Sequence, residues 1–515
     1  MSDDIVQEPA LDDLSRRVAA GAGWAQVSRL AEVLSSLALS LLLVRALGPT
    51  NYGQYSFLIN AATFAAIALS LGFPDTVMRF VSAFLARGAD AEARFLVRRL
   101  VLVRLVVYGV GVLLLLAFHG PIARALHLPL VDEYWVALAA LLVSQGAIEF
   151  STSYAYARLE SRDVALARTV AQILALGFFA VVVLLGKPTP AAAVLTVVIS
   201  FVLATLILLG RGLGRSLFTG RSSETPLAPV TRFAGAAWGA SLFTLGLAGQ
   251  IDVLLLGALR SDAVQIAYYS VATLIYVKLG VLLSGWAGTA VSSFAEVQTR
   301  RGLGAVKDYF GAYVRLHLLL SLVVYPPVIV LSGAITRGVF GPAYGAAAGL
   351  MAVYGVFWLG SSFLAAGIPF SSMLALGSQR QAVAIRATGG ILNVVLDVVL
   401  IPPLGALGAI VATGIANFVA HIGDFVVAAR RMKANYPWGF AARTGLAAAV
   451  ASVPAVLLRP EHLLGAVLVT ALYLVVFGAA LSVLRPLTPA DAVQAGRLNA
   501  RLGAVVERMV DRSHP

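Results

Sequence analysis

The sequence predicts an all-α membrane protein that crosses the bilayer about fourteen times. Apolar residues make up 59% of its 515 residues, only 12% are charged, and the mean hydropathy is +0.88. Soluble domains are far less apolar and carry about twice as many charges. The apolar residues gather in runs of about twenty, the length of a helix that spans the hydrocarbon core. Spanning strands would instead need alternating segments of about ten residues, so helices are the only choice.

Short connectors separate the apolar runs. The predicted spans are residues 27–47, 53–73, 100–119, 132–154, 164–186, 191–210, 232–258, 265–294, 312–332, 346–370, 383–401, 407–429, 442–458 and 463–484. The segment Thr76–Arg87 either continues the second span or lies at the interface as an amphipathic helix. The tail Thr488–Asp511 has apolar residues near helical spacing with arginines between them, which predicts a helix lying on the membrane surface.

The positive charges divide the connectors into two alternating sets. One set holds few of the 38 Lys and Arg residues: Arg45, Arg124, Lys187, Arg260, Arg337 and Arg459. Lys278 lies inside a span, and the others lie in the second set, in the tails, or at the adjoining helix ends. Cytoplasmic connectors carry this excess of Lys and Arg, so both termini are expected in the cytoplasm. The segment Met1–Arg17 lacks the apolar region of a cleavable signal peptide.

Several functional classes are excluded or disfavoured. Topology accounts for the net charge of +13, so we do not expect a nucleic-acid partner. The chain has no Cys, and its six His residues are scattered, so no metal site and no cofactor are expected. A phosphate-binding loop and a Gly-x-Ser-x-Gly elbow are absent, and the connectors are too short for a glycosyltransferase or polymerase. We therefore expect a secondary-type transporter rather than an enzyme.

The chain also contains an internal repeat. Residues 154–174 match 372–392 at an offset of 218, which pairs Arg162 with Arg380 and Arg168 with Arg386. Tyr55-Ser56 matches Tyr269-Ser270 at an offset of 214. These offsets place the seventh span on the first and favour two six-span bundles over two seven-span halves. Two parallel bundles of this kind suit alternating access, with a cavity at the repeat interface.

The repeat divides the chain into predicted domains. They are a cytoplasmic tail (1–22), a first six-helix bundle (23–215), a cytoplasmic linker (216–231), a second six-helix bundle (232–430), an appended helix pair (431–484) and a cytoplasmic amphipathic tail (485–515). Three Gly/Pro interruptions, Gly72-Phe73-Pro74, Tyr325-Pro326-Pro327 and Gly367-Ile368-Pro369, predict bends in their spans.

Lys278 is the most informative charge within a span. It follows about thirteen residues of the eighth span, so it lies roughly 20 Å from the outer face. A charge at this depth costs about 2.5–3.5 kcal/mol on insertion scales. Either Lys278 binds an anionic head group in a hydrated cavity, or it forms a structural ion pair or extends to the inner interface.

Other polar residues within the spans also allow more than one role. Asp252 in the seventh span is a candidate partner of Lys278 or a site of proton or sodium coupling. Arg29 and Glu32 lie three residues apart on one helix face and can neutralise each other. Arg45 and Arg79 end the first two spans, where they contact substrate or extend to the interface. The remaining polar positions, for which helix-to-helix hydrogen bonds are expected, are Glu149, Asn393, Asp397, Asn417 and Asp424.

Five motifs, in order along residues 25–430, carry a family resemblance. They are VRALGPTNYGQYSF (44–57), LGFPDTVMRFVS (71–82), QIDVLLLGAL (250–259) followed by AYYSVA (267–272), FGPAYGAAAGL (340–350) and LNVVLDVVLIPPLGALGAIVAT (392–413). Their order and spacing resemble the oligosaccharide-lipid flippases of the MATE-like multidrug/oligosaccharidyl-lipid/polysaccharide exporter superfamily. The match to its lipid II flippase branch is poorer, because the Pro-x-x-Arg pattern of that branch is missing after the second span.

The resemblance implies a protein of the bacterial plasma (inner) membrane that moves a polyprenyl-pyrophosphate-linked oligosaccharide to the outer leaflet. Family members bind their cargo with cations in a cavity, and the cations placed to serve here are Arg29, Arg45, Arg79 and Lys278. A glycan polymerase or glycosyltransferases are candidate partners, beside the membrane lipids. Two alternatives stay open. One is an ion-coupled multidrug efflux pump, which would use the acidic residues Glu32 and Asp252. The other is a non-transporting scaffold that recruits glycan-assembly enzymes.

Overall fold

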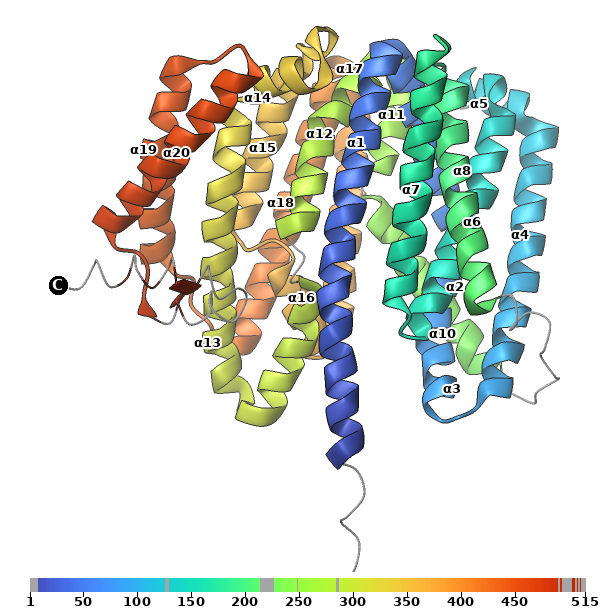
Figure 1. The fold of residues 1–515 in the computed structure, drawn as a ribbon, viewed down its shortest axis with the longest axis horizontal. Coiled ribbons are helices and arrows are strands. Elements are labelled where there is room, and N and C mark those ends of the chain that lie inside the picture. Colours follow the sequence, from blue (N-terminus) through green and yellow to red (C-terminus); the bar gives the residue numbers. More distant parts are fainter. Residues whose placement is uncertain are drawn as a thin grey trace, which may run out of the picture. The chain divides into compact units, whose positions relative to one another are not determined.

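The computed structural model confirms the all-α fold. It describes residues 8–125, 129–213, 227–247, 249–283 and 287–489, with residues 491–492, 503–504, 507 and 510 of the tail. Within these residues every regular element is a helix (Figure 1). Ten helices are long and apolar enough to cross a membrane, or eleven if the bent pair α15 (Ala347–Phe363) and α16 (Ile368–Ala375) is one span. The chain is a multi-pass membrane protein.

Most predicted spans correspond to one helix each within the described residues. These helices are α4 (Asp90–Ala125), α6 (Trp135–Ala157), α7 (Ser161–Leu184), α8 (Pro190–Leu208), α17 (Gln379–Leu404), α18 (Ala406–Met432), α19 (Trp438–Leu458) and α20 (Leu463–Leu484). Shorter elements connect them: α5 (Pro129–Glu133), α14 (Ser332–Ile335), η2 (Leu209–Leu213), η3 (Thr336–Phe340) and η4 (Pro342–Tyr344).

A single long helix, α1 (Glu8–Ala68), covers the first two predicted spans. The helix is broken at Gly48, whose φ is 70° and ψ is 172°. Glycine adopts positive φ without the steric cost that a Cβ brings, and Pro49 suits the first turn of the helix that follows. The first two spans are therefore separate helices on either side of this kink, as the sequence predicts.

Two other spans differ in detail from the predictions. The predicted span 232–258 is two helices, α10 (Ala228–Leu245) and α11 (Gln250–Arg260), because Gly249 has φ 78° and interrupts the helix. The predicted span 265–294 corresponds to α12 (Ala263–Leu283) and the start of α13 (Ala287–Val330). The predicted bend at Gly367 is present, since α15 and α16 meet at 42°.

The segment after the second span continues into the protein interior. It forms α2 (Phe73–Thr76), the π-helix η1 (Val77–Val81) and α3 (Ser82–Ala86). Phe73, Val77 and Val81 are buried in one cluster with residues of α4 and α6. This packing matches the first of the two predicted alternatives, a continuation of the second span.

The chain divides into two compact units. Unit 1 comprises Met1–Leu47 and Phe57–Leu242, and unit 2 comprises Gly48–Ser56 and Phe243–Pro515. The helix α10 therefore falls largely in unit 1, although the sequence analysis assigned 232–430 to the second bundle. Contacts with the segment before α2 explain its place: Trp238 Nε1 donates to the Ala68 carbonyl at 2.8 Å. The predicted linker lies outside the described residues up to 226.

Small residues let the helices of each unit approach closely. In unit 1, Ala167, Ala171 and Ala175 of α7 are fully buried at a spacing of four. Ala167 and Ala171 share a cluster with Ala204 and Leu208 at the end of α8. Between membrane helices the driving force is close packing rather than burial from water, so such stripes of small residues hold the bundle together.

The appended pair α19 and α20 packs on α13 within unit 2 (Figure 1). Tyr473 of α20 donates to the Leu322 carbonyl at 2.5 Å, and its ring joins a buried cluster with Leu318 and Leu322. Part of the tail reaches the same region, because Arg315 Nε donates to Asp491 Oδ1 at 2.7 Å and Val510 is buried. Most of the predicted amphipathic helix lies outside the described residues.

Two serines that the internal repeat pairs are in contact. Ser56 Oγ and Ser270 Oγ lie 2.6 Å apart, both in unit 2. Gly53 approaches the α12 N-terminus so closely that a Cβ there would lie 1.7 Å from the Ala263 carbonyl oxygen. Residues 48–56 thus pack on the start of α12, the element that the repeat aligns with them.

Gly72 offers a test of the close packing in unit 1. Its φ is 68°, and an added Cβ would lie 2.2 Å from the Ala234 carbonyl oxygen. We expect Gly72→Ala to destabilise the protein by about 3 kcal/mol, from backbone strain plus overpacking. Gly88→Ala is the matched control, because Gly88 has φ 71° but nothing within 4 Å of the added Cβ. Gly88→Ala should cost about 1–2 kcal/mol. Thermal unfolding of the purified variants measures both, and equal losses would contradict the proposed clash.

Candidate functional site

The predicted cargo-binding cations lie on different helices. Arg45 is exposed near the end of the first part of α1, and Arg79 is exposed on η1. Lys278 is half-buried and is the sixteenth of the 21 residues of α12. The side chains of Arg29 and Glu32 lie outside the described residues.

Arg79 rests on an aromatic support. Its guanidinium carbon lies 4.4 Å from the ring centre of Phe233 and 5.6 Å from that of Phe80. The two rings pack edge to face, with centres 5.7 Å apart. Cation–π contact holds a guanidinium in place without using its N–H groups. Arg79 can therefore donate hydrogen bonds to an anion from a fixed position.

Asp252 lies at the centre of a buried polar cluster in unit 2. It is in the first turn of α11 and is fully buried. Its carboxylate accepts from Tyr269 Oη of α12 at 2.5 Å, from Asn393 Nδ2 of α17 at 2.6 Å, and from Thr413 Oγ1 of α18. Lys278, the partner first suspected from the sequence, is not among these donors. The reason is that Asp252 is reached from α12 by Tyr269, and Lys278 lies nine residues farther along that helix, roughly 13 Å at 1.5 Å per residue.

A second buried carboxylate completes the cluster. Asp397 Oδ2 accepts from Asn393 Nδ2 at 3.3 Å, and Asp397 is fully buried. Asp397 Oδ1 and Asn393 Oδ1 have no hydrogen-bond partner among the described residues. Two buried carboxylates joined through one amide cannot both be ionised at low cost unless a cation accompanies them. The cluster therefore requires a proton or a bound cation.

The ligand types in this cluster narrow the choice of cation. Carboxylate, amide and hydroxyl oxygens suit hard cations, whereas transition metals prefer imidazole or thiolate. Within the described residues, no group of three or more His, Cys, Asp and Glu side chains could hold a metal ion. The donor set therefore fits a proton or a hard monovalent or divalent cation better than zinc or iron.

A cavity of about 370 Å³ lies next to the cluster, inside unit 2. Its walls come from α12, α13, α15, α17 and α18 and are largely aromatic, with Tyr325, Tyr354 and Trp358 packed on one another. Thr413 lines this cavity and also donates to Asp252. Thr413 therefore connects the carboxylate cluster to the wall of the cavity.

Further polar groups line the same cavity. They are His317, Ser361, Ser362, Arg386, Asn417 and His421. Arg386 Nη2 donates to Asp424 Oδ2 at 2.5 Å, and its guanidinium carbon lies 4.7 Å from the Phe370 ring centre. Since this ion pair neutralises Arg386, the cavity is not a strongly cationic site.

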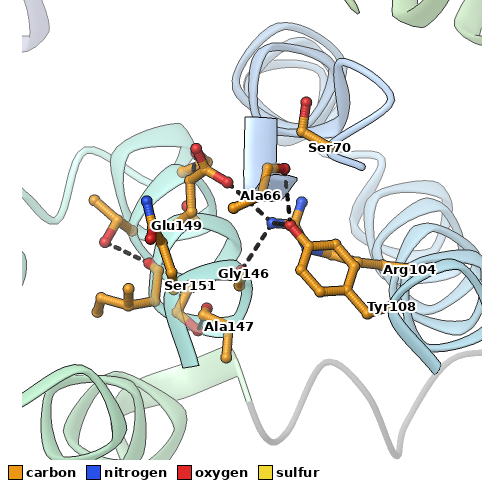
Figure 2. Close-up of polar contacts among 12 residues, drawn as sticks. Ala66, Ser70, Arg104, Tyr108, Gly146, Ala147, Glu149 and Ser151 are labelled. Carbon is orange, nitrogen blue, oxygen red and sulfur yellow. Dashed lines mark hydrogen bonds and ion pairs between the residues drawn. The ribbon is translucent and has the colours of Figure 1, made fainter. Parts of the chain in front are cut away.

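A second polar network ties three helices of unit 1 together (Figure 2). Arg104 Nη2 on α4 donates to Glu149 Oε2 of α6 at 3.0 Å and to the Gly146 carbonyl at 2.9 Å. It also donates to Tyr108 Oη at 3.1 Å, and Tyr108 in turn donates to the Ala66 carbonyl of α1 at 3.1 Å. A Cβ on Gly146 would lie 2.3 Å from the Tyr108 ring, so the residue must be small. The network is a structural tie inside the bundle.

Some of these hydrogen bonds between helices can be predicted from the sequence. Glu149, Asn393 and Asp424 form the expected hydrogen bonds between helices. Asn417 does not, because it donates to the Thr413 carbonyl of its own helix, and the partner of Asp397 is Asn393 on the same helix. The role of Arg104 in this network was not predicted. Arg104 lies near a basic helix end, where Lys and Arg are expected for topology alone. A spacing of four among Thr413, Asn417 and His421 signals the polar face of α18.

Comparison with known proteins places these features in a family. A model of the family described as "Polysaccharide biosynthesis protein" matches residues 18–292, which is more than half of the chain. The chain belongs to this family. No curated protein sequence matches it significantly.

The fold of this polysaccharide biosynthesis protein is also found in solved transporters. One is an inward-facing multidrug resistance MATE family transporter of the MOP superfamily, with a TM-score of 0.62 and 15% identity over 79% of this chain and 98% of that chain. Another is the lipid II flippase MurJ in an inward closed conformation, with a TM-score of 0.62 and 14% identity over 90% and 98% of the two chains. A third is a MOP superfamily transporter from Pyrococcus furiosus, with a TM-score of 0.59 and 13% identity over 81% of this chain and 95% of that chain.

These findings confirm the resemblance that the sequence motifs indicate. The family match makes the chain a polysaccharide biosynthesis protein, and the solved structures show that it has the fold of MATE transporters and of the flippase MurJ. At 13–15% sequence identity the solved structures show only that the fold is shared. The cargo therefore has to be inferred from this chain's own residues.

Proposed function

We propose that the protein is a flippase that moves a polyprenyl-pyrophosphate-linked oligosaccharide from the cytoplasmic to the outer leaflet of a bacterial plasma membrane by alternating access. The observation that carries the proposal is the family match over residues 18–292, a family of polysaccharide biosynthesis. The likeness of the fold to a lipid II flippase supports it. Surface polysaccharides are assembled on lipid carriers, so a family member with this fold has a lipid-linked glycan as its natural cargo.

The charged residues suit the pyrophosphate of such a cargo. Arg79 presents N–H donors from an aromatic support, and Arg45 is exposed. Lys278 and Arg29 are the other two proposed pyrophosphate-binding cations. Charge-assisted hydrogen bonds to phosphate oxygens are short and roughly twice as strong as neutral ones. The polyprenyl tail, which is as apolar as the lipid, can remain in the bilayer while the head group crosses.

Asp252 supplies the proposed coupling to a cation. Its buried cluster with Asp397, Asn393 and Thr413 takes up a proton or a cation such as sodium, which compensates the two carboxylates. Release of this cation into a lower concentration would favour one conformation of unit 2 over another. Binding energy shifts a conformational equilibrium only by the difference in affinity between the two states.

The buried carboxylates also suit an ion-coupled efflux pump, so the cargo has to be tested separately. Lys278→Ala in a strain that lacks the chromosomal copy distinguishes the functions. For a flippase we expect surface polymer to fall about tenfold or more, the effect of losing roughly 1.4 kcal/mol of cargo binding. Membrane insertion should be unchanged. Loss of drug tolerance alone would indicate efflux, and no change in either would favour a scaffold.

Lys187→Ala is the matched control for this experiment. Lys187 is exposed beyond the end of α7, outside the predicted spans. Its replacement removes the same charge without touching a span, so surface polymer should stay at the wild-type level. An equal loss in both variants would show that the effect comes from total charge rather than from a cargo site.

A further inference from the structure

A second cavity in unit 1 has the chemistry of an anion site. Its volume is about 320 Å³, at the lower end of the range for ligand pockets. It lies where α3, the start of α4 and the end of α6 meet, and its polar lining comes from Asp90, Arg94, Tyr154 and Arg158. Val81, Leu85 and Ala93 form its apolar wall. None of these residues belongs to the proposed cargo or cation sites.

Arg94 lacks a partner in this cavity. Its Nε is buried and has no hydrogen-bond partner among the described residues. Asp90 lies one turn earlier on α4 and lines the same cavity, but no ion pair joins the two within the described part of the chain. A buried donor that is left unsatisfied is costly, more so when it is charged. The position of Arg94 is explained if an anion occupies the cavity.

Arg158, the residue that follows α6, lines the same cavity and is held by two side-chain contacts. Its Nε forms an ion pair with Glu160 Oε1 at 2.8 Å, so Arg158 contributes directed N–H groups rather than an uncompensated charge, and its Nη1 donates to Tyr154 Oη at 3.3 Å. Its guanidinium carbon lies 5.7 Å from the Tyr154 ring centre. These contacts leave Nη2 without a hydrogen bond to any described residue. Guanidinium groups bind phosphate oxygens with this kind of prepared fork.

The backbone adds to the positive potential. The helix α4 begins at Asp90 and is 36 residues long, and Asp90, Ala93 and Arg94 of its first turns line the cavity. The positive end of the helix dipole favours an anion there, while the Ala93 N–H itself is used by the Ala89 carbonyl at 3.1 Å. The Asp90 carboxylate is exposed, so solvent screens its repulsion of a ligand. The excess of Lys and Arg assigns this end of unit 1 to the cytoplasmic side, at the level of lipid head groups.

We propose that this cavity binds the phosphate group of a lipid head group in the cytoplasmic leaflet. Arg94 and Arg158 hold the phosphate oxygens, and Val81 and Leu85 cover the apolar part of the lipid next to it. Two lipids share this chemistry, an anionic phospholipid and a polyprenyl pyrophosphate, and free pyrophosphate is the comparison without a lipid tail. The proposal is independent of the proposed cargo, because a phospholipid at this site would regulate or anchor unit 1 whatever the protein transports.

Binding to the purified full-length protein in phosphatidylcholine nanodiscs tests the proposal. Phosphatidylglycerol, undecaprenyl pyrophosphate and inorganic pyrophosphate are titrated separately, with thermal stability and mass-resolved lipid adducts as readouts. We expect at least one of these probes to bind, and the Arg94→Gln/Arg158→Gln variant to bind it about tenfold or more weakly. The probe that binds most tightly identifies the natural source.

Two further variants separate binding in the cavity from a general effect of surface charge. Arg98→Gln removes an exposed charge one turn along α4 from Arg94, outside the cavity lining, and should change binding less than about twofold. Leu85→Trp fills the cavity without changing charge and should weaken binding as the double variant does. If Arg98→Gln weakens binding as much as the double variant, the effect is general surface charge and the site is refuted. Equal binding of all probes by the wild type and the double variant would refute it as well.

Discussion

Replacing Asp252 with Asn is expected to abolish cation-driven transport while the protein still inserts and folds. Asn keeps the size of Asp and an oxygen that can accept from Tyr269 and Thr413, but it removes one of the two buried carboxylates. Without that carboxylate the cluster loses the oxygens that hold the cation or share its proton, and only Asp397 remains to be neutralised. We expect gradient-driven transport to slow about 100-fold or more, which corresponds to roughly 2.7 kcal/mol.

Proteoliposomes with an imposed sodium or proton gradient measure this effect. Asp308→Asn is the matched control, because Asp308 is an exposed acidic residue on α13 of the same unit. Its rate should equal that of the wild type under both gradients. The gradient to which only the wild type and the control respond identifies the coupling ion. A wild-type response by Asp252→Asn would show that the buried cluster has a structural role alone.

The second large effect is expected at Arg104. Arg104→Met leaves Glu149 without its ion-pair partner and breaks the link to Tyr108 and the Gly146 carbonyl. Removing one member of a buried pair costs about 3–5 kcal/mol. The Glu149 side chain is 32% exposed, and solvent can compensate part of its charge, so we expect about 3 kcal/mol.

The double variant Arg104→Met/Glu149→Leu separates the pair from the network. Replacing both charges by apolar groups of similar volume is often neutral. We therefore expect the double variant to recover most of the stability that Arg104→Met loses, as measured by thermal unfolding of all four proteins of the cycle. A double variant that is less stable than Arg104→Met would contradict an energetic role for the ion pair and favour a role for Arg104 in ordering the three helices.

The sequence predicts the helices well because membrane spans depend on composition and length. The apolar segments that form α17, α18, α19 and α20 can be recognised from their composition and length alone. Local breaks were harder to predict. Gly249 interrupts the seventh span in the structure, whereas most glycines within apolar runs do not end a helix, so the break depends on packing that the sequence alone does not reveal.

In the candidate sites, the charged residues can be predicted from the sequence, whereas their partners cannot. Asp252, Lys278 and Arg79 stand out in the sequence because a charge in an apolar run has a cost that demands a reason. Their partners do not stand out. Tyr269, Asn393 and Thr413 come from three helices, and only the fold brings them to Asp252. Arg94 and Arg158 were counted as topology charges, and the cavity between them requires coordinates to be seen.

The most direct test of the proposed function is flipping by the purified protein. Undecaprenyl pyrophosphate carrying a fluorescent oligosaccharide is placed in both leaflets of proteoliposomes, and a membrane-impermeant quencher reports how much becomes accessible from outside. We predict that the wild type makes nearly all of the label accessible, whereas Lys278→Ala makes about half accessible, as protein-free vesicles do. Equal accessibility in vesicles with and without wild-type protein, under either cation gradient, would contradict the proposal that this protein is a flippase of lipid-linked oligosaccharides.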